Sequence, residues 1–151
     1  MSWEVAVAVV LFALAPGFAL WRGGGPERFG ASAIVAWYAL DFLYHRVAGA
    51  SGFAQLDTVH LALDLAAFCV FLWLSLRANR LWPLAAVAFQ TVPILGHVVM
   101  LAGFPGMQRA YWAMTQVPPF FMALLLIGGT LAHRRRLRRL GPYRDWRLLH
   151  R

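Results

Sequence analysis

Five long runs of apolar residues, separated by short polar connectors, organise the chain. Each run is close to the roughly 20 residues that a helix needs to cross the hydrocarbon core of a bilayer. Inside lipid every backbone amide must be paired within its own segment, so runs of this kind form helices. Short connectors make consecutive helices antiparallel neighbours. The expected spans are Trp3–Trp21, Gly30–Gly49, Asp57–Leu76, Leu81–Leu101 and Ala110–His133.

The composition agrees with this pattern. Of the 151 residues, 61% are apolar and only 13% are charged, which is too apolar for a water-soluble domain. The predicted fold class is an all-α, polytopic transmembrane helix bundle. Its membrane domain covers residues 1–133, and residues 134–151 form a basic cytoplasmic tail. The connector "RGGGPERFG" lacks the lysine and hydroxyl residues of a phosphate-binding loop, so we expect a flexible turn there.

The arginines predict the orientation. All 14 basic residues are arginine. A cytoplasmic C-terminus places twelve of them on the inner side and only Arg46 and Arg109 on the outer side, as the positive-inside rule requires. Five spans then place the N-terminus outside, and we expect a multi-pass protein of the bacterial inner membrane. Trp21, Trp73 and Trp82 fall at the inner ends of spans, where amphipathic rings prefer to lie.

Prolines interrupt two of the expected helices. Pro93 and the pair Pro118–Pro119 should kink them and leave backbone carbonyls unpaired. Thr91 and Thr115 stand close enough in sequence to bond some of those carbonyls. The kinks are open to two interpretations, ordinary packing irregularity or the opening of a cavity.

Two mirrored acid–imidazole pairs lie inside the apolar runs. "DFLYH" holds Asp41 and His45, and "HLALD" holds His60 and Asp64. Each pair is spaced i, i+4 and so occupies one helix face. At about 1.5 Å per residue, an antiparallel hairpin brings the two aspartates to one depth and the two histidines to another, nearer the outer end.

Further polar residues fall at similar depth in the outer half of the bundle. They are Asp57, Gln90, His97 and Gln116. The inner halves of the expected helices carry almost no polar residues. An ionisable residue within a membrane segment is by default a functional hypothesis, so the outer half is the expected site.

Imidazole and carboxylate groups suit a divalent transition metal. The candidate ligands for a metal or protons are Asp41, His45, His60, Asp64 and His97. Haem is less favoured, because adjacent helix axes about 8–10 Å apart leave no room for a porphyrin between them. A pathway for protons or a solute would use the same residues, and a chain this small would then need to form an oligomer.

A structural interpretation stands beside these. The acid–imidazole pairs would then only fasten helices, at about 0.6 kcal/mol for an average polar contact. The protein would be a non-catalytic accessory or assembly subunit with a membrane-protein partner or a second copy of itself. The absence of a serine or cysteine nucleophile motif favours a protein that is not an enzyme.

The C-terminal tail carries eight arginines and one acid. Arginines near a membrane surface gain about 1 kcal/mol each on anionic lipid. Binding to nucleic acid is not favoured, because the tail contains no folded basic module. The lipid-contacting arginines are expected to be Arg134, Arg135, Arg136, Arg138 and Arg139.

The stretch "RANRLWPLAAVAFQTVPILGH" and the wider Ala-, Leu-, Trp- and Arg-rich style resemble small uncharacterised polytopic membrane proteins of high-GC alphaproteobacteria. The resemblance covers the region of the third to fifth spans. It carries no function with it.

Overall fold

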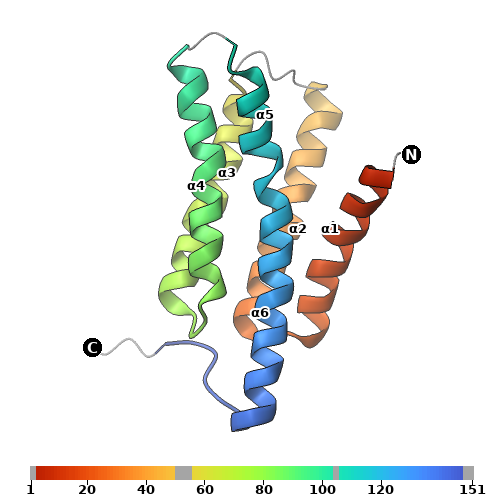
Figure 1. The fold of residues 1–151 in the computed structure, drawn as a ribbon, viewed down its shortest axis with the longest axis vertical. Helices are drawn as coiled ribbons and strands as arrows, with labels where there is room; N and C mark the ends of the chain where they lie inside the picture. Colours follow the sequence, from red (N-terminus) through yellow and green to blue (C-terminus); the bar gives the residue numbers. More distant parts are fainter. Residues whose placement is uncertain (1–2, 50–55, 104–105, 148–151) are drawn as a thin grey trace.

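Six helices make up most of the part of the chain that the structure describes. The computed structural model describes residues 3–49, 56–103 and 106–147, with side chains from Val9 onward. In the view of Figure 1, α1 to α4 run alternately down and up, and α5 and α6 follow one another downward, so that α1 begins in the upper half of the bundle and α6 ends at its lower end. The predicted all-α fold is confirmed for these residues. The helices are α1 (Trp3–Arg22), α2 (Gly25–Ala48), α3 (Thr58–Arg77), α4 (Trp82–Leu101), α5 (Gln108–Gln116) and α6 (Pro118–Leu140).

Three helical stretches of the described chain are long and apolar enough to cross a membrane. They are Thr58–Arg77, Trp82–Leu101 and Gln108–Leu140, and Val9–Arg22 is a shorter apolar helix. A membrane protein is therefore supported. The number of passes and the orientation stay predictions.

Helix α2 begins earlier than its apolar run. Gly25 is its first residue, and Pro26 stands in the first turn, where its fixed φ suits a helix and its missing N–H is not needed. The Glu27 side chain accepts a hydrogen bond from the backbone N–H of Gly24 at 3.0 Å. The prediction of a flexible turn is therefore wrong from Gly25 to Gly30, and this extension carries Glu27 into the bundle.

The fifth expected span is divided at Val117. Pro118 and Pro119 follow directly, and neither can donate to the carbonyl four residues earlier. Helix α4, in contrast, continues through Pro93.

The expected rescue of freed carbonyls by threonine is not seen. Thr115 donates to the carbonyls of Tyr111 and Trp112, and Thr91 donates to that of Ala88. These acceptors lie within the turns that precede the prolines and are not the carbonyls that the prolines free.

The packing centres on Trp82 at the start of α4. Helix α1 packs on α2 and α6, and α4 packs on α3 and α6. The Trp82 indole lies between Gly30 of α2 and Gly129 of α6 and is 8% exposed. Two glycines open a slot for the ring, so Trp82 stands at the end of its helix but packs inside the bundle.

Candidate functional site

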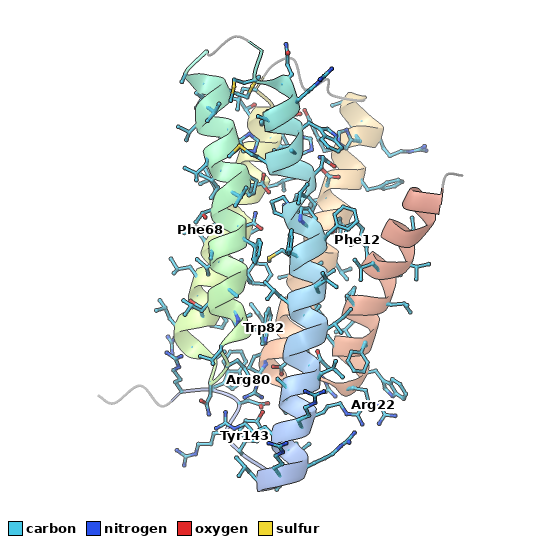
Figure 2. The ribbon with its side chains drawn as sticks, viewed as in Figure 1. Phe12, Arg22, Phe68, Arg80, Trp82 and Tyr143 are labelled. Carbon is cyan, nitrogen blue, oxygen red and sulfur yellow. The ribbon has the colours of Figure 1, made fainter. Side chains whose placement is uncertain are left out.

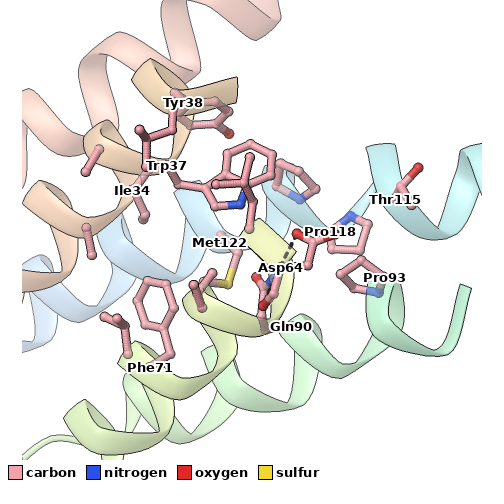
Figure 3. A pocket seen from close by; sticks show the side chains of 18 residues that line it. Ile34, Trp37, Tyr38, Asp64, Phe71, Gln90, Pro93, Thr115, Pro118 and Met122 are labelled. Carbon is pink, nitrogen blue, oxygen red and sulfur yellow. Dashed lines mark hydrogen bonds between the residues drawn. The ribbon is translucent and has the colours of Figure 1, made fainter. Parts of the chain in front are cut away.

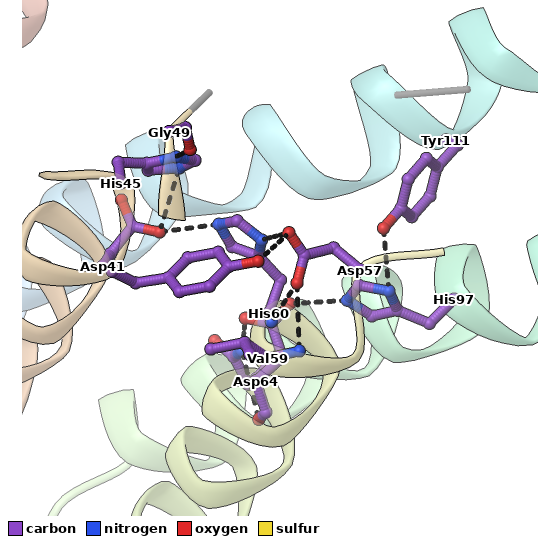
Figure 4. A network of polar contacts seen from close by, with 11 residues as sticks. Asp41, His45, Gly49, Asp57, Val59, His60, Asp64, His97 and Tyr111 are labelled. Atoms are coloured by element: carbon purple, nitrogen blue, oxygen red, sulfur yellow. Dashed lines mark hydrogen bonds and ion pairs between the residues drawn. The ribbon is translucent and has the colours of Figure 1, made fainter. Parts of the chain in front are cut away.

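Three side chains converge near the upper end of α2 and α3. Asp41 and His45 come from α2 and His60 from α3; we call these three residues the upper site. One oxygen of Asp41 lies 2.7 Å from His60 Nε2 and 3.7 Å from His45 Nε2. One ligand atom from each residue lies within 4.8 Å of the others. Figure 4 shows them facing one another across the two helices.

The Nε2 atoms of His45 and His60 are the ones near Asp41, and the Nδ1 atom of each ring is held by another acceptor. His45 Nδ1 lies 3.2 Å from the carbonyl oxygen of Gly49, and His60 Nδ1 lies 2.9 Å from a carboxylate oxygen of Asp57. A carbonyl or carboxylate oxygen accepts only, so each Nδ1 carries a proton, and His60 Nε2, 2.7 Å from a carboxylate oxygen of Asp41, carries a second one. The two Nε2 atoms therefore point together toward Asp41.

Asp57 supports this arrangement from the N-cap of α3. Its side chain accepts from the backbone N–H groups of Val59 and His60, and its second oxygen accepts from the Tyr44 hydroxyl at 3.0 Å. Burial alone would raise the pKa of Asp57, but the hydrogen bonds from the backbone and ring of His60 and from Tyr44 outweigh it and lower the pKa to about 2. Asp57 is thus an anchored anion behind His60.

Removing the Asp57 charge should weaken the acid sensitivity of the fold. The folded pKa of about 2 lies below the ordinary value of 3.8. The stabilisation is therefore fully present above that ordinary value and is lost as the pH falls toward 2. We expect Asp57→Asn, which can still cap the helix, to lose less stability than the wild type between pH 4 and pH 2.

The measurement is the free energy of unfolding in detergent as a function of pH. At neutral pH, Asp57→Ala should be about 1 kcal/mol less stable than Asp57→Asn, because alanine removes the helix cap as well as the charge. Equal pH dependence in Asp57→Asn and the wild type would contradict the assignment.

A second set of polar residues is buried between α3, α4 and α5. We call Asp64, Gln90, His97 and Tyr111 the buried polar group. One Asp64 oxygen accepts from Gln90 Nε2 at 3.1 Å and the other from His97 Nε2 at 3.1 Å. His97 Nδ1 then accepts from the Tyr111 hydroxyl at 3.0 Å. His97 is completely buried and both its nitrogens are engaged, so the group joins helices and leaves no imidazole lone pair free.

The five residues predicted as one site thus lie in two groups. The rings of His45 and His60 are 5.0 Å apart, as the predicted histidine layer requires. The two aspartates do not share one site, because the Asp41 side chain contacts His60 whereas the Asp64 side chain contacts Gln90 and His97 of α4. Gln116 is exposed at the end of α5.

Sequence reasoning missed two tyrosines of these groups. Tyr44 lies at i+3 from Asp41, on the same helix face as His45, so its spacing was a usable signal. Tyr111 lies on α5, and nothing in its local sequence indicates that it reaches His97.

The lower end of the bundle contains a buried ion pair. Arg80, in the α3–α4 connector, donates from Nε to Glu27 Oε1 at 2.8 Å, and the two side chains are 5% and 0% exposed. Trp82 Nε1 donates to the same oxygen at 3.1 Å. Arg80 and Trp82 lie close together at this end in Figure 2.

The segment after α6 returns to this ion pair. The Asp145 carboxylate accepts from Arg80 Nη2 and from the backbone N–H of Gly25. His133 Nδ1 accepts from Arg80 Nη2 at 2.9 Å and from the Tyr143 hydroxyl at 2.7 Å. We call Glu27, Arg80, His133, Tyr143 and Asp145 the lower network.

Apart from His133, the lower network lies outside the expected apolar runs. Burial alone would raise the pKa of Asp145, but the Gly25 N–H and the Arg80 guanidinium outweigh it and hold the pKa below its ordinary value. Burial raises the pKa of Tyr143, although the charge of Arg80 opposes the rise. The chain therefore keeps an anion, a cation and a neutral phenol in contact at its lower end.

The expectation that the inner halves of the expected helices carry almost no polar residues did not extend to the segments beside them. Glu27 lies in the N-terminal extension of α2 and Arg80 in the α3–α4 connector, and the structure buries both. A usable signal was present, since the chain has only six acidic residues and Asp145 is the single acid among the tail arginines.

The tail arginines stay mostly at the surface. Helix α6 continues to Leu140 and presents Arg135, Arg138 and Arg139 to solvent, while Arg134 is half-buried. Arg136 is exposed and its guanidinium lies 4.3 Å from the centre of the Tyr143 ring. Contact of these residues with anionic lipid stays a prediction, and residues 148–151 of the tail lie outside the described part of the chain.

Among the described residues, the three side chains of the upper site are close enough together to hold a metal ion. Comparison with known proteins does not assign the chain to a family. No family model matches the chain, and neither a curated protein nor a solved structure is significantly similar to it.

Proposed function

We propose that the upper site binds a divalent transition metal ion through Asp41, His45 and His60. The observation that carries this proposal is the orientation of the two rings. The Nδ1 atoms of His45 and His60 are bound to a backbone carbonyl and a carboxylate, so both Nε2 atoms face one Asp41 oxygen. A metal-binding histidine typically has its other nitrogen held by such an acceptor, which fixes the ring and raises its basicity.

Two imidazoles and one carboxylate suit Zn²⁺, Fe²⁺ or Mn²⁺. Three protein ligands leave at least one coordination position for water or another molecule. The side chains of Asp41, His45 and His60 are 24%, 37% and 20% exposed, so an ion can enter from outside the bundle. Without a metal, His60 donates from Nε2 to Asp41 and from Nδ1 to Asp57, and a bound metal ion would replace the proton on Nε2.

The proposed setting is a five-span protein of the bacterial inner membrane with its N-terminus outside. The three membrane-length helices and the additional apolar helix in α1 support it, as does the arginine distribution along the chain. In this topology the upper site faces the outer compartment. The lower network and the tail arginines then lie on the cytoplasmic side.

A structural role fits the buried polar group better than metal binding. His97 is fully buried with both ring nitrogens engaged, and the carboxylate of Asp64 is shared between Gln90 and His97. Asp64 and His97 therefore serve as fasteners between α3 and α4. This division assigns the ligand chemistry to the hairpin of α2 and α3 alone.

Purified protein should bind Zn²⁺ or Co²⁺ at one site per chain. We expect His45→Ala and His60→Ala each to weaken binding by at least about a hundredfold, since a ligand is lost. Asp57→Asn should weaken it by about tenfold through loss of the carboxylate behind His60. Metal titration measures the affinity, and the visible spectrum of bound Co²⁺ reports the ligand geometry.

Gln116→Ala is the matched control, because Gln116 is an exposed polar residue of α5. Its metal affinity should equal that of the wild type. Unchanged affinity in the double variant His45→Ala/His60→Ala, with the helical content preserved, would overturn the proposal.

A further inference from the structure

A cavity of about 200 Å³ lies deeper in the bundle than the upper site. It is bounded by α2, α3, α4 and the break between α5 and α6, and most of its lining is apolar. Pro93, Pro118 and Pro119 are among the lining residues. The prolines that interrupt the fifth expected span thus coincide with a hollow, which favours the cavity interpretation of those residues.

One polar donor in this cavity has no acceptor. Among the described residues, the buried indole nitrogen of Trp37 makes no hydrogen bond, and Trp37 lines the cavity. Figure 3 shows the Trp37 ring reaching from α2 into the cavity, with Asp64 and Gln90 across from it. An unpaired N–H in an apolar interior is costly, so a ligand oxygen placed there would be stabilised.

The opposite wall carries a carboxylate. Asp64 lines the cavity and is held in place by Gln90 and His97. A carboxylate wall repels an anion and gives a neutral acceptor no such penalty. The carboxylate thus disfavours anions, and the mostly apolar lining disfavours ions of either sign, so the site selects uncharged molecules.

Size and access narrow the ligand class further. An apolar cavity of about 150 Å³ holds one benzene ring, so this cavity accommodates a ring-sized group. Ala36, Leu40 and Ala66 line it and are exposed on the outer surfaces of α2 and α3. Access on that side is from the bilayer in the proposed topology.

We propose that this cavity binds an uncharged, lipid-soluble carbonyl compound with a ring-sized head, whose oxygen accepts a hydrogen bond from Trp37. The site is separate from the upper site and needs no metal. It uses the apolar lining for affinity, the indole N–H for orientation and Asp64 for exclusion of anions.

Three aromatic probes of nearly equal shape test the proposal on the full chain in detergent micelles. Acetophenone carries the carbonyl, α-methylstyrene replaces its oxygen by a methylene group, and benzoate is an anion. The readout is the indole N–H region of a ¹H–¹⁵N spectrum, where the spectrum of Trp37→Phe identifies the Trp37 signal among the seven tryptophans. We expect acetophenone to move that signal downfield saturably and to bind about fivefold more tightly than α-methylstyrene.

Two variants separate the hydrogen bond from the cavity. Trp37→Phe keeps an aromatic ring and removes the donor, so it should bind both neutral probes equally. Because this variant has no Trp37 signal, its affinity is measured from the backbone amide signals of the lining residues Ile34 and Phe71. Ala67→Phe, which places a ring in the cavity, should abolish saturable binding, and unchanged signals for the other tryptophans show that it is folded. A linear response without saturation, equal affinity of the neutral probes for the wild type, or binding of benzoate as tight as that of acetophenone would overturn the proposal.

Discussion

Replacement of Arg80 by methionine is expected to destabilise the protein by about 3–5 kcal/mol. The substitution leaves Glu27, which is completely buried, without its cation. The Asp145 carboxylate loses the same partner. Breaking one side of a buried ion pair costs far more than the pair itself contributes, because an uncompensated charge stays inside. The free energy of unfolding, followed by circular dichroism during SDS titration from a mild detergent, measures the effect.

Arg77→Met is the matched control. Arg77 ends α3, three residues before Arg80, and its side chain is exposed, so its loss should change stability by no more than about 0.5 kcal/mol. The double variant Glu27→Gln/Arg80→Met should be more stable than the sum of the single effects predicts, since it removes both charges. Equal stability of Arg77→Met and Arg80→Met would contradict the buried ion pair.

Gly129→Ala is expected to destabilise the bundle by about 1–3 kcal/mol. A Cβ at this position would lie 2.4 Å from Cδ1 and 2.5 Å from Cγ of Trp82. These atoms belong to a rigid ring, and on its other side a Cβ at Gly30 would lie 2.5 Å from Cη2. The indole therefore has no room to move. Thermal unfolding in detergent compares the variant with the wild type.

The adjacent residue provides the control. A Cβ at Gly128 meets nothing within 4 Å, so Gly128→Ala should keep or raise stability, as alanine favours a helix. Gly129→Ala should also cost less when Trp82 is replaced by phenylalanine, which is smaller. A Gly129→Ala protein as stable as the Gly128→Ala protein would show that the ring is not confined.

The helices were predictable because the cost of an unpaired backbone amide in lipid leaves few alternatives for a long apolar run. The upper site followed from the same constraint. Once Asp41, His45 and His60 lie on facing sides of an antiparallel hairpin, their contact is a matter of register and spacing. The break at Val117 was predictable in kind, because two consecutive prolines remove two backbone donors.

Other features could not be predicted, because they depend on contacts between segments that are far apart in the sequence. Asp64 had two possible neighbours, α2 and α4, and spacing within α3 cannot choose between them. Glu27 and Arg80 are 53 positions apart, and Trp82, which donates to the same Glu27 oxygen, is itself held between glycines of α2 and α6. The start of α2 was misplaced because hydrophobicity marks a membrane segment, whereas a helix extends as far as its caps allow.

The return of the C-terminal segment has a consequence for the order of assembly during synthesis. Asp145 bonds Gly25, which is 120 positions earlier, as well as Arg80. A ribosome releases α1 to α4 before it reaches residue 145, so the nascent bundle must hold Arg80 without this carboxylate. Chains that end before Asp145 lack its hydrogen bonds to Gly25 and Arg80, which join the C-terminal segment to the lower end of the bundle. They become targets for the chaperones and proteases that remove partly unfolded proteins.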